Sequence, residues 1–126
     1  MHKNLTMVFT VKVNEDQKYY WLIEIISCMQ PFKSLRPREK EVLAAILKVS
    51  VETKNLPKEQ QQLIVFHHLT KEKIAKEVGI SLDNLYNVIL SLRKKNILND
   101  SGIADKYYKV LTQETNEITF KFSSND

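Results

Sequence analysis

Residues 74–98, with the sequence IAKEVGISLDNLYNVILSLRKKNIL, constrain the fold more than any other part of this chain. Apolar residues recur there at helical spacing on both sides of Gly79, and glycine readily takes the left-handed conformation that ends a helix. Ser81 suits the N-cap of a second helix, and Asn96 suits its left-handed end. The pattern predicts two helices that cross at a tight turn. The residues expected to be buried between them are Ile74, Val78, Ile80, Leu85, Ile89 and Leu92.

The sequence before this pair predicts one strand and further helices. Residues 5–13 alternate apolar and polar side chains, which is typical of a half-buried strand. Helical spacing follows over residues 16–30, and Pro31 should end that helix. The next helix is expected to begin at a Ser34 N-cap and to end at Asn55.

The remaining boundaries come from capping residues and alternation. Residues 57–66 begin with proline and predict a short helix, and Thr70 is expected to cap the first helix of the crossing pair. Residues 105–111 suit either a strand or an irregular edge. Residues 117–122 alternate again, so the chain should end in a strand. The first and last strands are expected to pair, because neither could shelter an apolar face alone.

Composition indicates one soluble-type domain without catalytic machinery. Hydrophobic residues make up 43% of the 126 residues and charged residues 27%, which supports a packed core. No glycine-rich phosphate loop, Ser-His-Asp order or paired acidic motif stands out, so neither an enzyme nor a cofactor is expected. Adjacent His67 and His68 project to different sides and lack a third ligand, so no metal is expected. Cys28, the only cysteine, is expected to be a small core residue.

The crossing pair resembles the winged helix-turn-helix family. The resemblance rests on the isoleucine-alanine pair at Ile74, the Gly79-Ile80-Ser81 turn, the apolar residues that follow at Leu85, and a lysine near the end of the second helix. It implies a winged helix-turn-helix that binds double-stranded DNA, as transcriptional regulators do. A helix with Pro37-Arg38-Glu39 near its start, a short helix that starts at Pro57 and the sequence IAKEVGIS at residues 74–81 occur together in one small protein. In this combination the chain also resembles small helix-turn-helix proteins of tailed bacteriophages.

The resulting expectation is a single domain over residues 1–126 with an α+β, mostly helical fold. Residues 1–33 would supply a strand and a helix, residues 34–98 a helical core with the helix-turn-helix, and residues 99–126 a wing and the C-terminal strand. No stretch approaches the roughly 18 apolar residues of a membrane span, and the first residues do not resemble a signal peptide. We therefore expect a cytoplasmic protein without a membrane partner, found in the host cytoplasm or in the virion if it is encoded by a phage.

Several outward positions of the second helix are suited to DNA. Asn84 and Asn87 carry amides that pair with adenine, and Tyr86 suits a phosphate or a thymine methyl group. A basic run ends the helix, which suits phosphates and is equally typical of a solvated helix end. Basic residues also surround the start of the helix expected from Ser34; they suit phosphates too, although a solvated helix surface is the more common reason for such a set. The candidate DNA contacts are Ser81, Asn84, Tyr86, Asn87, Arg93, Lys94, Lys95, Arg36 and Arg38.

Other residues favour protein contacts instead. Asp83 lies where a carboxylate would repel phosphate, and the predicted wing is acidic, with Glu114 and Glu117. Exposed apolar residues are more typical of protein interfaces. The candidate interface residues are Leu82, Leu90 and Trp21.

Three functions remain open at this point. The first is a DNA-binding regulator, expected to be a homo-oligomer because one short helix gives limited specificity. The second is a bacteriophage virion assembly subunit of the head-tail connector type, which would use the winged helix for contacts with other protein subunits. The third is an adaptor that binds a host protein.

Overall fold

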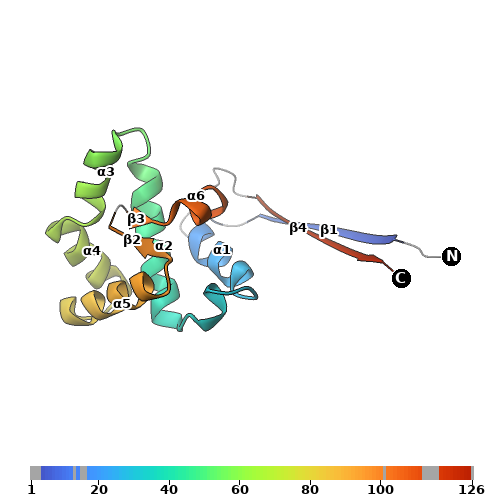
Figure 1. The fold of residues 1–126 in the computed structure, drawn as a ribbon, viewed down its shortest axis with the longest axis horizontal. Helices are drawn as coiled ribbons and strands as arrows, with labels where there is room; N and C mark the ends of the chain where they lie inside the picture. Colours follow the sequence, from blue (N-terminus) through green and yellow to red (C-terminus); the bar gives the residue numbers. More distant parts are fainter. Residues whose placement is uncertain (1–3, 13, 15–16, 101, 112–116, 126) are drawn as a thin grey trace.

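Helix α2 (Pro37–Glu52) is the centre of the fold, and most of the other described helices pack against it (Figure 1). Its side chains Val42, Leu43, Ile46 and Leu47 are buried almost completely. The computed structural model describes residues 4–12, 14, 17–100, 102–111 and 117–125. The remaining described elements are β1 (Asn4–Lys12), α1 (Lys18–Ile26), η1 (Phe32–Ser34), α3 (Lys58–Val65), α4 (His68–Val78), α5 (Leu82–Lys94), β2 (Leu98–Asn99), β3 (Gly102–Ile103), α6 (Asp105–Leu111) and β4 (Glu117–Asn125). The fold is α+β and mostly helical, as predicted.

The start of α2 differs from the sequence prediction. Ser34 does not cap it, because that residue ends the short 3₁₀ turn η1. Arg36 is the N-cap, with an extended backbone, and Pro37 occupies the first helical position, where its missing N–H leaves no hydrogen bond unmade. The helix ends at Glu52, three residues before the predicted end at Asn55.

Helices α3 and α4 begin close to the predicted positions, but α4 has a different cap. Pro57 precedes α3 as expected. Thr70 was predicted to cap α4, and that prediction is wrong. The Nδ1 atom of His67 accepts a hydrogen bond from the backbone N–H of Leu69 at 3.1 Å, so a histidine ring takes the role expected of a hydroxyl, and α4 starts at His68.

The turn between α4 and α5 has the predicted local chemistry. Gly79 has φ 78°, and the N–H groups of Gly79 and Ile80 both donate to the carbonyl of Ala75, at 2.9 and 3.0 Å. Ser81 Oγ then accepts the N–H of Asn84 at 3.1 Å and caps α5. Asn96 has φ 61° beyond the other end of α5, as predicted.

The shared apolar core of this pair is largely as expected. Ile74, Leu85, Ile89 and Leu92 are buried, whereas Val78 and Ile80 are partly buried against the same core. One prediction is corrected. Leu82 is not an exposed apolar residue: it lies three positions before Leu85, extends the buried stripe of α5, and packs against the core.

The described residues between α5 and β4 do not form a strand-rich wing. β2 and β3 form an antiparallel pair of two residues each. The segment predicted to be a strand or a wing edge is helix α6 instead. Packing explains this difference, because Tyr107 meets the Phe32 ring edge-on, with ring centroids 4.9 Å apart, and Leu111 is fully buried. Glu114 lies outside the described residues.

The first and last strands pair, which confirms the prediction. β1 and β4 run antiparallel over nine residues each, with Asn4 opposite Asn125 and Lys12 opposite Glu117. Figure 1 shows this two-stranded ribbon extending away from the helices. Residue 13, predicted to belong to the first strand, lies outside the described residues.

Helix α1 is shorter than residues 16–30 and covers one side of α2. It ends at Ile26, before Pro31, and buries Tyr19, Leu22 and Ile23. Trp21, a candidate interface residue, is 48% exposed. Among the described residues, no helix combines the length and the apolar character that crossing a bilayer requires.

Candidate nucleic-acid interface

Helix α5 presents a polar face opposite its buried stripe. Asn84 and Asn87 are exposed, and Tyr86 is exposed over 42% of its surface. The ammonium group of Lys71, from α4, lies 4.9 Å from the centre of the Tyr86 ring, at the distance of a cation–π contact. The amides that were predicted to read bases are therefore accessible, and a cation stands beside the tyrosine.

The start of α2 lies against this face and forms a groove with it. The groove has a volume of about 690 Å³. Arg36 and Arg38 line one side, and Asn87, Val88 and Ser91 of α5 line the other. The sequence could not show that the basic start of α2 would lie beside an amide of α5, since about fifty residues separate them in the chain.

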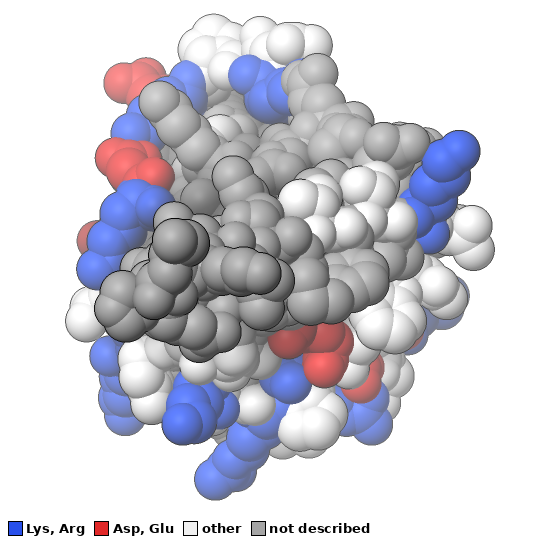
Figure 2. Space-filling model, turned by 90° about the vertical axis from the view of Figure 1, so that its right-hand side faces the viewer, with Lys and Arg blue, Asp and Glu red and all other residues white. Residues whose placement is uncertain are grey.

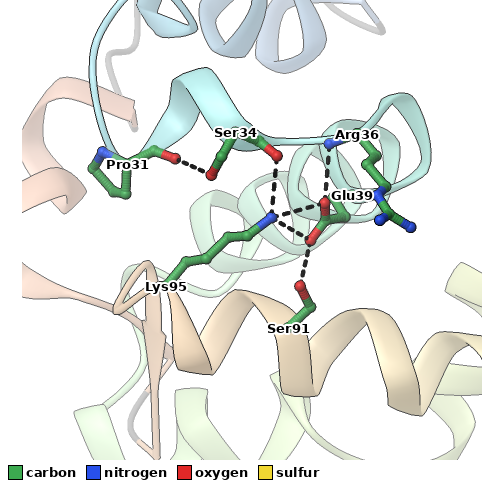
Figure 3. A network of polar contacts seen from close by, with 6 residues as sticks. All are labelled: Pro31, Ser34, Arg36, Glu39, Ser91 and Lys95. Carbon is green, nitrogen blue, oxygen red and sulfur yellow. Dashed lines mark hydrogen bonds and ion pairs between the residues drawn. The ribbon is translucent and has the colours of Figure 1, made fainter.

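The carboxylate of Glu39, which lines this groove, is the centre of a network of polar contacts (Figure 3). Its Oε1 accepts the backbone N–H of Arg36 at 2.9 Å, and its Oε2 accepts the hydroxyl of Ser91 at 2.6 Å. Lys95 Nζ lies 3.0 Å from both oxygens and donates a further bond to the carbonyl of Ser34 at 3.2 Å. The network joins the start of α2 to the end of α5.

The Glu39 carboxylate stays charged although its side chain is only 6% exposed. Burial on its own would raise the pKa of Glu39, but hydrogen bonds from Ser91, from the Arg36 N–H and from Lys95 stabilise the charged form more, so the pKa is lowered. The ammonium group of Lys95 is paired with the carboxylate of Glu39 in this network. Lys95 therefore leaves the set of candidate phosphate contacts, which corrects the sequence prediction.

Arg38 joins the groove to the turn between α4 and α5. Its Nη1 donates to the carbonyl of Val78, the last residue of α4, at 2.8 Å, and lies 3.3 Å from a carboxylate oxygen of Glu41. A cation at a helix C-terminus complements the helix dipole. The Arg38 side chain is nevertheless 55% exposed, so its charge also reaches solvent at the edge of the groove.

The basic run at the end of α5 does not act as one cluster. Arg93 turns toward α3, where its guanidinium lies 5.3 Å from the centre of the Phe66 ring and 3.6 Å from the carboxylate of Asp100. Its Nε is buried and has no hydrogen-bond partner among the described residues. Lys94 is exposed. Three consecutive basic residues thus have three different surroundings.

Figure 2 shows the side of the molecule that faces a viewer looking from the ribbon end. In this view the coloured Lys and Arg side chains lie scattered around the rim of the molecule.

Among the described residues no group of three or more His, Cys, Asp and Glu side chains could hold a metal ion. Cys28 is exposed and not in the core, because α1 ends two residues earlier, so the sequence prediction for it was wrong.

Leu90 differs from the other apolar residues of α5. The Leu90 side chain is 53% exposed, as the sequence predicted, whereas the Leu82 side chain is partly buried against the core.

Comparisons with protein-family models, with curated proteins and with solved structures found no significant match. Functional proposals for this chain therefore depend on its own residues.

Proposed function

We propose that this protein binds double-stranded DNA, with α4 and α5 acting as a helix-turn-helix and α5 entering the major groove. The observation that carries the proposal is the groove in which Arg36 and Arg38 lie beside Asn87. Guanidinium groups bind phosphate, and a carboxamide forms paired hydrogen bonds with adenine. The two kinds of group that a DNA reader needs thus occur side by side, and transcriptional regulation is the role that fits them.

The local geometry supports this use of α5. Ser81 caps the helix at its N-terminus, so the first turns are firmly formed where a reading helix meets the bases. Asn84 and Asn87 lie on these turns and are exposed. The Glu39–Lys95 ion pair holds α5 against α2, so the positions of these amides relative to Arg36 are fixed before any ligand arrives.

The test is a fluorescence-anisotropy titration of random-sequence duplex DNA at two salt concentrations. The double variant Arg36→Gln/Arg38→Gln should bind more weakly, and its affinity should depend less on salt, because each lost phosphate contact lowers the slope by about one. The matched control is Lys58→Gln/Lys106→Gln, which removes the same charge from exposed positions on α3 and α6, away from the groove.

Equal losses in the two double variants would contradict the proposal, because general charge and not the groove would then govern binding. The role of Asn87 is tested separately by selecting binding sites from a random pool. Asn87→Ala should relax the preference at one base position and reduce discrimination there by about 1–3 kcal/mol. Selection of the same sequence by both proteins would remove Asn87 from the interface.

A second candidate function is assembly with other protein subunits, such as those of a phage virion. Leu90 favours it, because an apolar side chain 53% exposed on a reading helix is more typical of a protein interface. In that case Leu90→Asp would abolish association with the subunit partner and leave the helical circular-dichroism signal unchanged. The charge variants of the groove would have no effect on assembly.

A further inference from the structure

The ribbon of β1 and β4 has an unpaired edge on each side. Within the described residues these strands form a sheet of two, so each has one neighbour only. Two-stranded sheets are marginally stable in water, and an open edge readily accepts another strand. The ribbon also extends away from the helices, so a second chain can approach it (Figure 1).

The two edges differ in the residue at their middle. The middle of β4 is Lys121, and a lysine on an edge strand is a common device against pairing. The middle of β1 is Val8, a β-branched residue that favours strands and is 58% exposed. Val8 and Lys121 stand opposite each other in the ribbon, so the contrast is between neighbouring positions. The edge of β1 is therefore better suited than the edge of β4 to pairing with another strand.

We propose that β1 pairs with β1 of a second copy of this chain, antiparallel and about a two-fold axis at Val8. The product is a four-stranded sheet in the order β4, β1, β1, β4, which reaches the number of strands that an independently stable sheet needs. The inference does not depend on DNA binding. It identifies a second copy as the partner and the β1 edge as the interface.

The sequence of β1 is complementary to itself in this register. Val8 faces Val8 of the second copy, Met7 faces Phe9, and Thr6 faces Thr10. Apolar pairs and threonine pairs directly opposite each other stabilise antiparallel strands. At the ends of the strand, Asn4 faces Lys12, so no like charges meet anywhere in the nine-residue strand. The same full-length pairing of β4 would place Lys121 against Lys121, which is repulsive.

The backbone groups also match in this register. Along one strand of an antiparallel pair, residues whose N–H and C=O bond to the partner strand alternate with residues whose groups point outward. A two-fold axis at Val8 places every residue opposite one that is an even number of positions away. The backbone N–H and C=O groups that point outward from one copy therefore lie opposite those that point outward from the other copy.

Cysteine cross-linking tests the register directly. In a Cys28→Ser background, Val8→Cys should form a disulfide-linked dimer on mild oxidation, because opposite positions in adjacent strands have Cβ atoms about 4.5–5.5 Å apart. Thr10→Cys is the matched control. It is also exposed, but the two copies of position 10 would be about 13 Å apart along the strand. Cross-linking of Val8→Cys alone supports the proposal; equal cross-linking, none, or preference for Thr10→Cys overturns it.

Charge exchange at position 8 tests the two-fold symmetry without oxidation. By sedimentation velocity the unmodified protein should be a dimer, and Val8→Lys and Val8→Glu should each be monomeric with unchanged helical circular dichroism. An equal mixture of the two variants should restore the dimer, because position 8 faces only position 8 of the other copy. A monomeric unmodified protein, or a mixture that stays monomeric, would refute the pairing.

Discussion

Lys95 Nζ lies 3.0 Å from each carboxylate oxygen of Glu39, a residue 56 positions earlier in the chain. Glu39 is buried and Lys95 is a quarter exposed, so water screens this ion pair only in part. The pair fixes the end of α5 to the start of α2. The shape of the groove that carries the functional proposal therefore depends on it.

Removal of the Glu39 charge should destabilise the protein. Glu39→Gln leaves the partly buried ammonium of Lys95 without its counterion and is expected to lower the free energy of unfolding by about 1–3 kcal/mol at neutral pH. Urea titration followed by circular dichroism measures the change. Glu41→Gln is the control, because the pair it forms with Arg38 is exposed and its loss should change stability by less than about 0.5 kcal/mol.

The Glu39→Gln effect should depend on pH in one direction. The pKa of Glu39 is lowered in the folded protein, so its charged form contributes stability above the unfolded-state value of about 4.3. That contribution is lost as the pH falls through the lower folded-state pKa. The difference in unfolding free energy between the unmodified protein and Glu39→Gln should therefore be full at pH 7 and shrink below about pH 4. A difference that is constant down to pH 3 would contradict the lowered pKa.

Core packing between α4 and α5 gives a second test of stability. Leu85 is fully buried, so Leu85→Ala should lower the free energy of unfolding by about 2–5 kcal/mol. Leu90→Ala makes the same chemical change at an exposed position of the same helix and should cost less than about 1 kcal/mol. Similar losses for the two variants in urea titrations would show that the buried face of α5 is wrongly identified.

Gly79 and Asn96 have positive φ at the ends of α4 and α5, so alanine at either position should lower stability, whereas glycine should not. Gly79→Ala should cost about 1 kcal/mol from backbone conformation, because no atom from another part of the described structure lies within 4 Å of the added Cβ. Asn96→Gly should be neutral or slightly stabilising, whereas Asn96→Ala should cost about 1 kcal/mol, since φ there is 61°. Thermal unfolding of the three variants gives the order. A stabilised Gly79→Ala would refute the left-handed turn.

Arg36 and Arg38 should differ in how much they contribute to stability, although the proposal gives them the same role on DNA. Arg38 donates a hydrogen bond to the carbonyl of Val78, so Arg38→Gln should cost about 0.5–1.5 kcal/mol. The exposed Arg36 side chain makes no capping bond, and Arg36→Gln should change stability by less than about 0.5 kcal/mol. Each variant alone should lower the salt slope of DNA binding by about one. A stability loss confined to Arg36→Gln would contradict the contact with Val78.

Some local features of the fold could be predicted from sequence because neighbouring residues determine them, although the caps predicted at Ser34 and Thr70 were wrong. Gly79 and Asn96 allow positive φ, and Ser81 is a good cap wherever it precedes a helix. The pairing of β1 with β4 was predictable for another reason, since each strand lacked any other partner of similar length.

Features set by tertiary contacts could not be predicted in this way. The basic run at the end of α5 suggested three equivalent cations, but Lys95 is paired with Glu39 from another helix and Arg93 lies over Phe66. Helix α6 carries two tyrosines that favour strands, and its helical state depends on packing, such as that of Tyr107 on Phe32. The groove itself depends on how α2 crosses α5, which no local pattern encodes.

The first and last strands pair like the two strands of a β-hairpin, but the connection between them is the helical part of the protein. Lys12 and Glu117 are opposite each other at the end of the ribbon where that connection begins and ends. If the helices unfold, that connection becomes a flexible loop of about a hundred residues, whose closure alone costs about 4 kcal/mol. In a single copy of the chain the ribbon therefore has little stability of its own. In the monomeric variant Val8→Lys, the amide hydrogens of the ribbon should exchange with solvent no more slowly than those of the helical core, because every opening of the core also releases the two strands.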